Sequence, residues 1–301
     1  MSIKYTPNKH HVAQSFADAA QQYDDVAILQ RQTADELLER LSFVTLQPNI
    51  ILDLGAGTGR NLSLLAQHYP DAALIAVDIA PAMLKQAQRR YKQDLGLKRW
   101  LPGQHKVRFL AGDAESLPLA DNSVDMIYAN LSLQWCEPQK CFAEIQRVLR
   151  PGGLLSFTTL GPDTLHELRQ SWAAVDDYPH VNIFYDMHDI GEAMMNSGLT
   201  EPVLDVERMT LTYDTAMALM KDLKELGAHN VNSGRRRGLT GKHALQKMIA
   251  SYEQFRQQGV LPASYEVVYG HAWCSEPAQQ QSSDGTIKVP VSQISRRSAS
   301  E

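Results

Sequence analysis

The stretch that decides the fold is Ile50-Ile51-Leu52-Asp53-Leu54-Gly55-Ala56-Gly57-Thr58-Gly59. A short apolar run ends in three glycines at alternate positions, and Leu62 and Leu65 follow at helical spacing. This order is typical of a strand, a tight turn and a helix N-terminus, where backbone N–H groups approach a ligand without Cβ atoms in the way. Asp78 lies nineteen residues after Gly59, at the end of a second apolar run, where a carboxylate can accept both hydroxyls of a ribose. The sequence therefore predicts a Rossmann-type sheet that binds a nucleoside-bearing ligand.

The glycine spacing indicates which ligand this is. A dinucleotide site has the pattern G-x-G-x-x-G facing a pyrophosphate, whereas this chain has G-x-G-x-G with Asp53 two residues before the first glycine. A carboxylate there suits an ammonium group and would repel a phosphate. S-adenosylmethionine meets these conditions, and a glycine turn that serves only packing is the alternative. The expected cofactor-binding residues are Asp53, Gly55, Ala56, Gly57, Gly59, Asp78, Ile79, Met83, Asp113, Ala114, Asn130 and Leu131.

Apolar and helical segments alternate through the rest of the chain. Further strands are expected near residues 107–110, 124–129, 154–160, 204–213 and 264–273, which predicts a parallel, doubly wound sheet with its ligand at the strand carboxyl ends. Asp113 follows the third strand, where it can accept the adenine amine. The pattern over residues 46–160 resembles the class I S-adenosylmethionine-dependent methyltransferases. That resemblance implies an α/β fold with a Rossmann-like, seven-stranded sheet.

We expect four regions along the chain. Residues 1–45 form an N-terminal helical lid, 46–160 the cofactor-binding core, 161–274 the substrate-side helices and last strands of the same domain, and 275–301 a disordered tail. An apolar stripe in the lid includes Tyr23, which either packs on the sheet edge or faces the ligand. The helix after Gly161 is expected to begin at an N-cap, Asp163 or Thr164. A helical insertion over residues 214–263 separates the sixth and seventh strands and would lie over the strand carboxyl ends.

Composition narrows the class of protein. With 301 residues, of which 44% are hydrophobic, the chain can bury a full core, and its net charge of -5 argues against a general binder of nucleic acid or membrane surfaces. Three cysteines form no C-x-x-C pair and no zinc set, so we expect reduced thiols, a cytoplasmic location and no metal. No apolar stretch has the length of a membrane span.

Three consecutive arginines, flanked by glycines, stand inside the insertion. Arg235, Arg236 and Arg237 form either a solvated turn or an anion-recognition site, since a guanidinium group binds carboxylate or phosphate through two hydrogen bonds. Asn130 is followed by Leu-Ser-Leu instead of the Pro-Pro-aromatic run of enzymes that methylate nucleobase amines. Methylation of a DNA amine is therefore disfavoured.

Segments outside the core carry a more specific resemblance. Residues 130–135, 161–169, 181–191, 219–230 and 269–273 together resemble the malonyl-acyl-carrier-protein O-methyltransferases of biotin synthesis. The likeness runs from about residue 12 to residue 274. It implies methyl transfer from S-adenosylmethionine to the free carboxylate of a malonyl thioester, at the start of the pimeloyl part of biotin synthesis.

The resemblance also implies a chemistry and a partner. A carboxylate with a pKa of about 4 is ionised at pH 7, so the reaction needs no general base. The partner would be acyl carrier protein bearing malonyl-phosphopantetheine, which Arg235–Arg237 would dock by charge. The alternatives are a methyltransferase-like protein-arginine hydroxylase and a non-catalytic assembly factor. The candidate catalytic or wall residues are Tyr23, Gln134, Trp135, His229 and Asn230.

Overall fold

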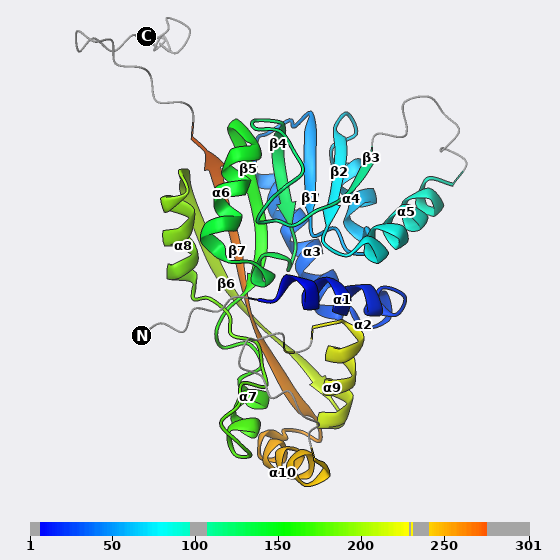
Figure 1. The fold of residues 1–301 in the computed structure, drawn as a ribbon, viewed down its shortest axis with the longest axis vertical. Helices are drawn as coiled ribbons and strands as arrows, with labels where there is room; N and C mark the ends of the chain where they lie inside the picture. The colour runs from blue at the N-terminus through cyan, green and yellow to red at the C-terminus, as the bar shows by residue number, and fades with distance from the viewer. Residues whose placement is uncertain (1–6, 97–106, 229, 231–240, 276–301) are drawn as a thin grey trace, which may run out of the picture.

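A seven-stranded sheet runs through the part of the chain that the computed structural model describes, which comprises residues 7–96, 107–228, 230 and 241–275 (Figure 1). The strand order is β3-β2-β1-β4-β5-β7-β6. The strands are β1 (Ile50–Leu54), β2 (Ala73–Asp78), β3 (Val107–Ala111), β4 (Val124–Ala129), β5 (Leu149–Leu160), β6 (Leu199–Tyr213) and β7 (Leu261–Cys274). The Rossmann-like fold expected from the glycine-rich turn is therefore confirmed.

The prediction of a wholly parallel sheet is wrong at one edge. Strands β1 to β5 pair in parallel, but β7 lies between β5 and β6 and runs antiparallel to both. Tyr213, the last residue of β6, pairs with Leu261, the first residue of β7. Because the helical insertion leaves and re-enters the sheet at the same end, the returning strand has to run in the opposite direction.

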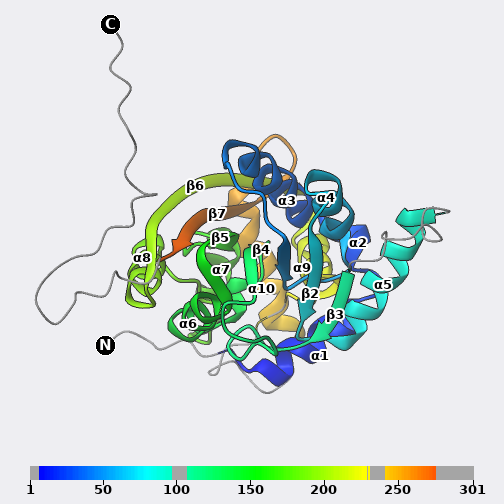
Figure 2. The ribbon, with the colours of Figure 1, turned by 90° about the horizontal axis from the view of Figure 1, so that it is seen from above.

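Helices cover both faces of the sheet (Figure 2). Successive side chains of each strand point to opposite faces. On one face, residues such as Ile51 and Leu74 pack with α3 (Ile28–Arg40), α4 (Arg60–His68) and α5 (Pro81–Leu95). On the other face, residues such as Leu52 and Phe157 pack with α6 (Pro138–Val148) and α8 (Met187–Asn196). These two buried layers hold the sheet in place. The loops at the strand ends therefore have fixed positions from which they can form a site.

The remaining helices gather beyond the carboxyl ends of the parallel strands. Figure 1 shows α1 lying across this end, with α9 and α10 beyond it, beside the ends of β6 and β7. The N-terminal region is helical, as expected, but it forms the three helices α1, α2 and α3. These elements are α1 (Lys9–Ala19), α2 (Tyr23–Val26), α7 (His166–Ala173), α9 (Ala216–Glu225) and α10 (Lys242–Tyr252), with short 3-10 turns η1 (Leu41–Phe43), η3 (Leu133–Trp135) and η4 (Glu253–Phe255).

The predicted N-cap of α7 is wrong. Leu165 stands at the cap with a left-handed φ of 54° and no capping side chain. The expected caps have other partners: the Thr164 hydroxyl accepts a hydrogen bond from the backbone N–H of Glu266, and Asp163 pairs with Arg208. Contacts with residues distant in the sequence therefore override the local capping preference of Asp163 and Thr164. Among the described residues, no helix has both the length and the apolar character to cross a membrane.

Candidate active site

The loops that follow the first four strands surround a cavity at the sheet's carboxyl end. Gly55 has a left-handed φ of 76°, and a Cβ there would lie 2.3 Å from Cβ of Ser132 in the loop after β4. Only glycine lets these two loops approach so closely. Gly57, with a φ of 54°, has no neighbouring atom within 4 Å of its missing Cβ and lines the cavity. The turn therefore presents bare backbone to the cavity.

Most of the expected cofactor residues line this cavity. They are Gly55, Gly57, Asp78, Ile79, Met83, Asp113, Ala114, Asn130 and Leu131. The other three, Asp53, Ala56 and Gly59, are not among its lining residues. Gly59 is needed for packing instead, because a Cβ there would lie 2.7 Å from Cβ of Ala87 on α5.

Two buried carboxyl groups shape the electrostatics beneath the glycine turn. Burial, and then the charge of Asp78, raise the pKa of Asp53 to about 7. Burial raises the pKa of Asp78 to about 6, although hydrogen bonds from the N–H groups of Ala80 at 2.8 Å and Gly57 at 2.9 Å oppose this shift. Atom Oδ2 of Asp53 is buried without a hydrogen-bond partner among the described residues. This acceptor fits a ligand with an ammonium group, such as S-adenosylmethionine.

The cavity also has lining residues that sequence reasoning did not assign to the cofactor. Lys9, Val12 and Phe16 reach it from α1, and Trp135 and Cys136 from the segment after β4. The apolar stripe of the N-terminal region predicted that α1 packs against another part of the protein. No sequence pattern indicated that this helix borders the cavity.

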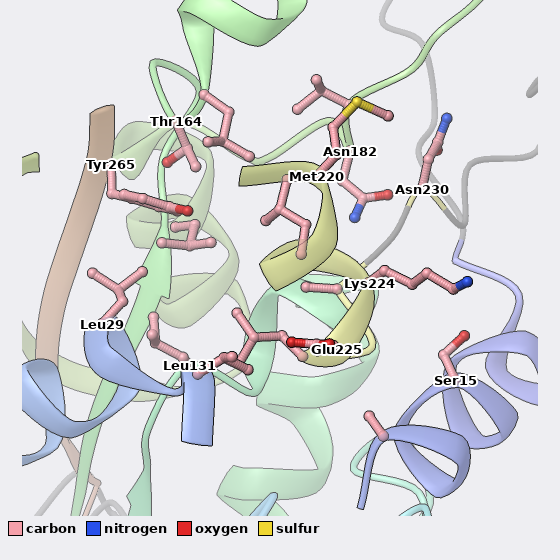
Figure 3. Close-up of a pocket in the computed structure, with 18 of the residues that line it drawn as sticks. Ser15, Leu29, Leu131, Thr164, Asn182, Met220, Lys224, Glu225, Asn230 and Tyr265 are labelled. Carbon is pink, nitrogen blue, oxygen red and sulfur yellow. The ribbon is translucent and has the colours of Figure 1, made fainter. Parts of the chain in front are cut away.

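A second, larger chamber of about 870 Å³ adjoins the cofactor cavity. Its wall is mainly apolar and comes from α1, α2, α3, α7, α9 and the ends of β5, β6 and β7. In Figure 3, Tyr265 and Thr164 lie at one side of the chamber, and Lys224, Asn230 and Ser15 at the other. Asp18, Gln22, Lys221 and Lys224 are the exposed lining residues. The chamber therefore opens between α1, α2 and α9.

The cofactor cavity and the chamber share a partition. Phe16, Tyr23, Leu131 and Trp135 line both spaces. The ring of Phe16 packs edge to face on Trp135, with centroids 5.4 Å apart, and on Tyr23 at 6.4 Å. Burial, followed by the charges of Asp78 and Asp24, raises the pKa of Tyr23 above its ordinary value. The Tyr23 phenol thus stays protonated and can donate a hydrogen bond, but it is a poor base.

The predicted catalytic candidates converge on the chamber. Tyr23, Gln134, Trp135 and Asn230 all line it. Gln134 is 7% exposed and donates a hydrogen bond of 2.7 Å to the carbonyl oxygen of Leu131, while Asn230 donates to the carbonyl oxygen of Pro179. His229 and Arg235–Arg237 lie outside the described residues.

The chamber also has polar groups that were not predicted, of which His180 has the most distinctive surroundings. The imidazole of His180 stacks on Trp172 with ring centroids 3.8 Å apart, and its Nε2 lies 2.8 Å from Oδ1 of Asp176. Both rings line the chamber, as does Asn182. Trp172 lies in α7, whereas His180 and Asn182 stand in a segment without regular structure between α7 and α8. No short-range pattern places such a segment against a site.

The fold and the paired cavities define a class I S-adenosylmethionine-dependent methyltransferase, and residues 52–157 match the family model described as "Methyltransferase domain". A malonyl-[acyl-carrier protein] O-methyltransferase from Nitrosospira multiformis is 48% identical over 277 residues, which cover 90% of each chain. One from Gallionella capsiferriformans is 45% identical, covering 96% of this chain and 98% of its own. The crystal structure of the YcgJ protein from Bacillus subtilis has the same fold, with a TM-score of 0.57 and 17% identity over 82% of this chain and 100% of that one. The chain belongs to the malonyl-[acyl-carrier protein] O-methyltransferase family.

Proposed function

We propose that the protein methylates the free carboxylate of a malonyl group carried on the phosphopantetheine of acyl carrier protein. The family relationship supports this substrate. The observation that carries the proposal is the shared partition, because an acyl group in the chamber would meet the cofactor across Tyr23, Leu131 and Trp135. S-adenosylmethionine supplies an electrophilic methyl group when bound.

The roles of the cofactor-site residues follow from their surroundings. Asp53 lies beneath the glycine turn and outside the cavity lining, and its unpartnered Oδ2 would accept an ammonium group placed against that turn. Asp78 would accept the ribose hydroxyls. Asp113 lines the cavity beyond β3 and would accept the adenine amine. Ligand binding would keep Asp53 ionised, because an ammonium partner offsets the burial that raises its pKa.

The chamber would position the nucleophile and exclude water. A malonyl carboxylate is already ionised at pH 7 and needs no proton removed. Tyr23, Gln134, Trp135 and Asn230 can hold it by hydrogen bonds, and the apolar wall keeps competing water out. The protonated phenol of Tyr23 suits this task, since a donor orients a carboxylate without forming an ion pair that would blunt it.

The partner would dock at the opening of the chamber. Acyl carrier protein is acidic, and the exposed Lys221 and Lys224 line the opening on α9. Arg235–Arg237 follow α9 in the sequence, and their part in docking stays a prediction. So does a cytoplasmic location, which fits the three free cysteines.

The decisive experiment compares two carrier-protein substrates. Malonyl-acyl carrier protein should yield a methyl ester by mass spectrometry, with a rate nearly flat from about pH 6 to 9 at saturating cofactor. Acetyl-acyl carrier protein has no free carboxylate and should yield none. Equal cofactor turnover with the acetyl form would refute carboxyl methylation. A hydroxylated arginine in a protein substrate would indicate the alternative hydroxylase, which the O-methyltransferase names of the relatives do not favour.

A further inference from the structure

Lys9, in the first turn of α1, binds the loop that follows β3. Its Nζ lies 2.9 Å from Oδ1 of Asp113, 2.8 Å from Oε1 of Glu115 and 3.4 Å from Sγ of Cys136. The side chains of Lys9 and Glu115 are 25% and 16% exposed. Burial alone would lower the pKa of Lys9, but these neighbours together raise it. The ammonium therefore stays charged at this partly buried position.

The acceptors around Lys9 resemble a small cation site. One ligand atom each from Asp113, Glu115 and Cys136 lies within 4.8 Å of the others. The ammonium of Lys9 is within 3.4 Å of all three residues. The cation in this cluster is therefore the ammonium of Lys9, which occupies the cluster only when α1 is docked.

Helix α1 is a wall of two spaces at once. Val12 and Phe16 line the cofactor cavity, whereas Ser15 and Ala19 line the chamber. The chamber side of α1 is also tightly packed, because a Cβ on Gly227 after α9 would lie 2.8 Å from the carbonyl oxygen of Ser15. If α1 moves away from the sheet, both the cofactor cavity and the chamber lose a wall.

The lid has a second attachment at α2. Oδ1 of Asp24 accepts a hydrogen bond of 2.7 Å from the hydroxyl of Thr58 in the glycine-rich turn, and its Oδ2 pairs with Arg90 on α5 at 2.7 Å. The lid is therefore attached at Lys9 to one side of the cofactor cavity and at Asp24 to the other.

Lys9 and the cofactor can share Asp113. Oδ1 of Asp113 accepts from Nζ of Lys9 and from the backbone N–H of Glu115 at 3.0 Å. None of the hydrogen bonds found among the described residues uses Oδ2, which leaves it for the adenine amine. A bound cofactor would also touch Val12 and Phe16. Cofactor binding and docking of α1 should consequently favour each other.

We propose that Lys9 is a positioning residue that fastens α1 over the cofactor cavity, and that the acyl substrate therefore binds tightly only after the cofactor. This inference rests on the proposed function for the identity of the acyl substrate. When α1 closes on the cofactor, it completes the chamber wall. Lys9 does not line the chamber, so its ion pairs affect acyl binding only through the position of α1.

The first test measures binding of S-adenosylhomocysteine by calorimetry to the wild type, Lys9→Met and Lys85→Met. Lys85 is an exposed lysine on α5 and serves as the matched control. Lys9→Met should weaken binding about tenfold, with a smaller loss at high salt, whereas Lys85→Met should not change it. A Lys9→Met affinity within twofold of the wild type overturns the proposal, whatever the acyl substrate does.

The second test measures binding of malonyl-coenzyme A, a soluble malonyl thioester, with and without saturating S-adenosylhomocysteine. The wild type should bind it at least fivefold more tightly with S-adenosylhomocysteine, within the usual range of coupling between sites. Lys9→Met should weaken malonyl-coenzyme A binding to the free enzyme, although the variant enzyme stays folded. Equal affinity of the wild type in both states refutes the binding order. If malonyl-coenzyme A binds to no form, the measurement is repeated with malonyl-acyl carrier protein; absence of binding there too would contradict the proposed function, and the first test still decides the role of Lys9.

A double-mutant cycle separates fastening from a general structural role. Glu115→Gln alone should also weaken S-adenosylhomocysteine binding. The loss in the double variant should be smaller than the sum of the two single losses, because both changes remove the Lys9–Glu115 ion pair, although Lys9→Met also removes the pair with Asp113. Additive losses in the double variant would contradict the fastening role.

Discussion

Replacing Asp53 by asparagine should stabilise the protein and weaken its cofactor binding together. The carboxyl group is 1% exposed, and its pKa of about 7 in the folded protein compares with 3.8 ordinarily. The folded state thus holds the proton more tightly than the unfolded state. The stability of the cofactor-free protein should fall as the pH rises from about 4 to about 7, and the loss is complete above that range.

The size of this effect follows from the shift. At about 1.4 kcal/mol for each pKa unit, a rise of about three units destabilises the cofactor-free protein by up to about 4 kcal/mol at pH 8. Asparagine has the same shape and no charge, so Asp53→Asn should remove most of that cost. Loss of a charge-assisted hydrogen bond of about 1.5–3 kcal/mol should weaken S-adenosylmethionine binding roughly tenfold or more.

Thermal melts and calorimetry can check both effects. Without cofactor, Asp53→Asn should melt several degrees above the wild type at pH 8, and the difference should shrink toward pH 5. Asp177→Asn, at an exposed position between α7 and α8, is the control and should match the wild type at both pH values. A lower melting temperature of Asp53→Asn at pH 8, or unchanged cofactor affinity, would refute the reasoning.

Three further predictions concern the cofactor turn and the docking surface. Asp78→Ala should lower S-adenosylmethionine affinity at least tenfold by calorimetry; unchanged affinity would remove Asp78 from the site. Gly59→Ala should cost about 2 kcal/mol or more in urea unfolding because its Cβ meets Ala87, whereas Gly57→Ala meets no atom, so it should cost only the strain of its positive φ and mainly weaken cofactor binding. Replacing Arg235, Arg236 and Arg237 together by glutamate should raise the KM for malonyl-acyl carrier protein, with a smaller rise at high salt, and leave cofactor binding intact. Equal impairment with malonyl-coenzyme A would argue against a docking role.

The cofactor half of the site could be predicted because its signals are local. The turn at Gly55 and Gly57 needs bare backbone, and Asp78 and Asp113 follow strands whose ends must meet at one edge of the sheet. The direction of β7 was missed because antiparallel and parallel strands have the same apolar pattern. It depends on where the insertion re-enters the sheet, which is a property of the whole connection.

The chamber could be predicted only in part, because its wall comes from segments far apart in the sequence. Tyr23 and Trp135 were identified, but His180 in the chamber and Lys9 at the cofactor cavity were not. Lys9 lies 104 residues from Asp113, and a lysine near a chain's start is ordinarily a solvated surface group. Only the tertiary fold shows that its charge is held against the cofactor cavity.

The apolar partition itself should matter for the rate of the proposed reaction. A carboxylate and a sulfonium have opposite charges that cancel during transfer, so a polar surrounding stabilises the reactants more than the transition state. Leu131 lines both the cofactor cavity and the chamber, and its φ of 46° is one that asparagine also adopts readily. Leu131→Asn should therefore lower the single-turnover rate about tenfold at saturating substrates, while Leu131→Met, which keeps an apolar side chain, should lower it much less. If both variants transfer the methyl group at the same rate, the polarity of the partition does not contribute to catalysis.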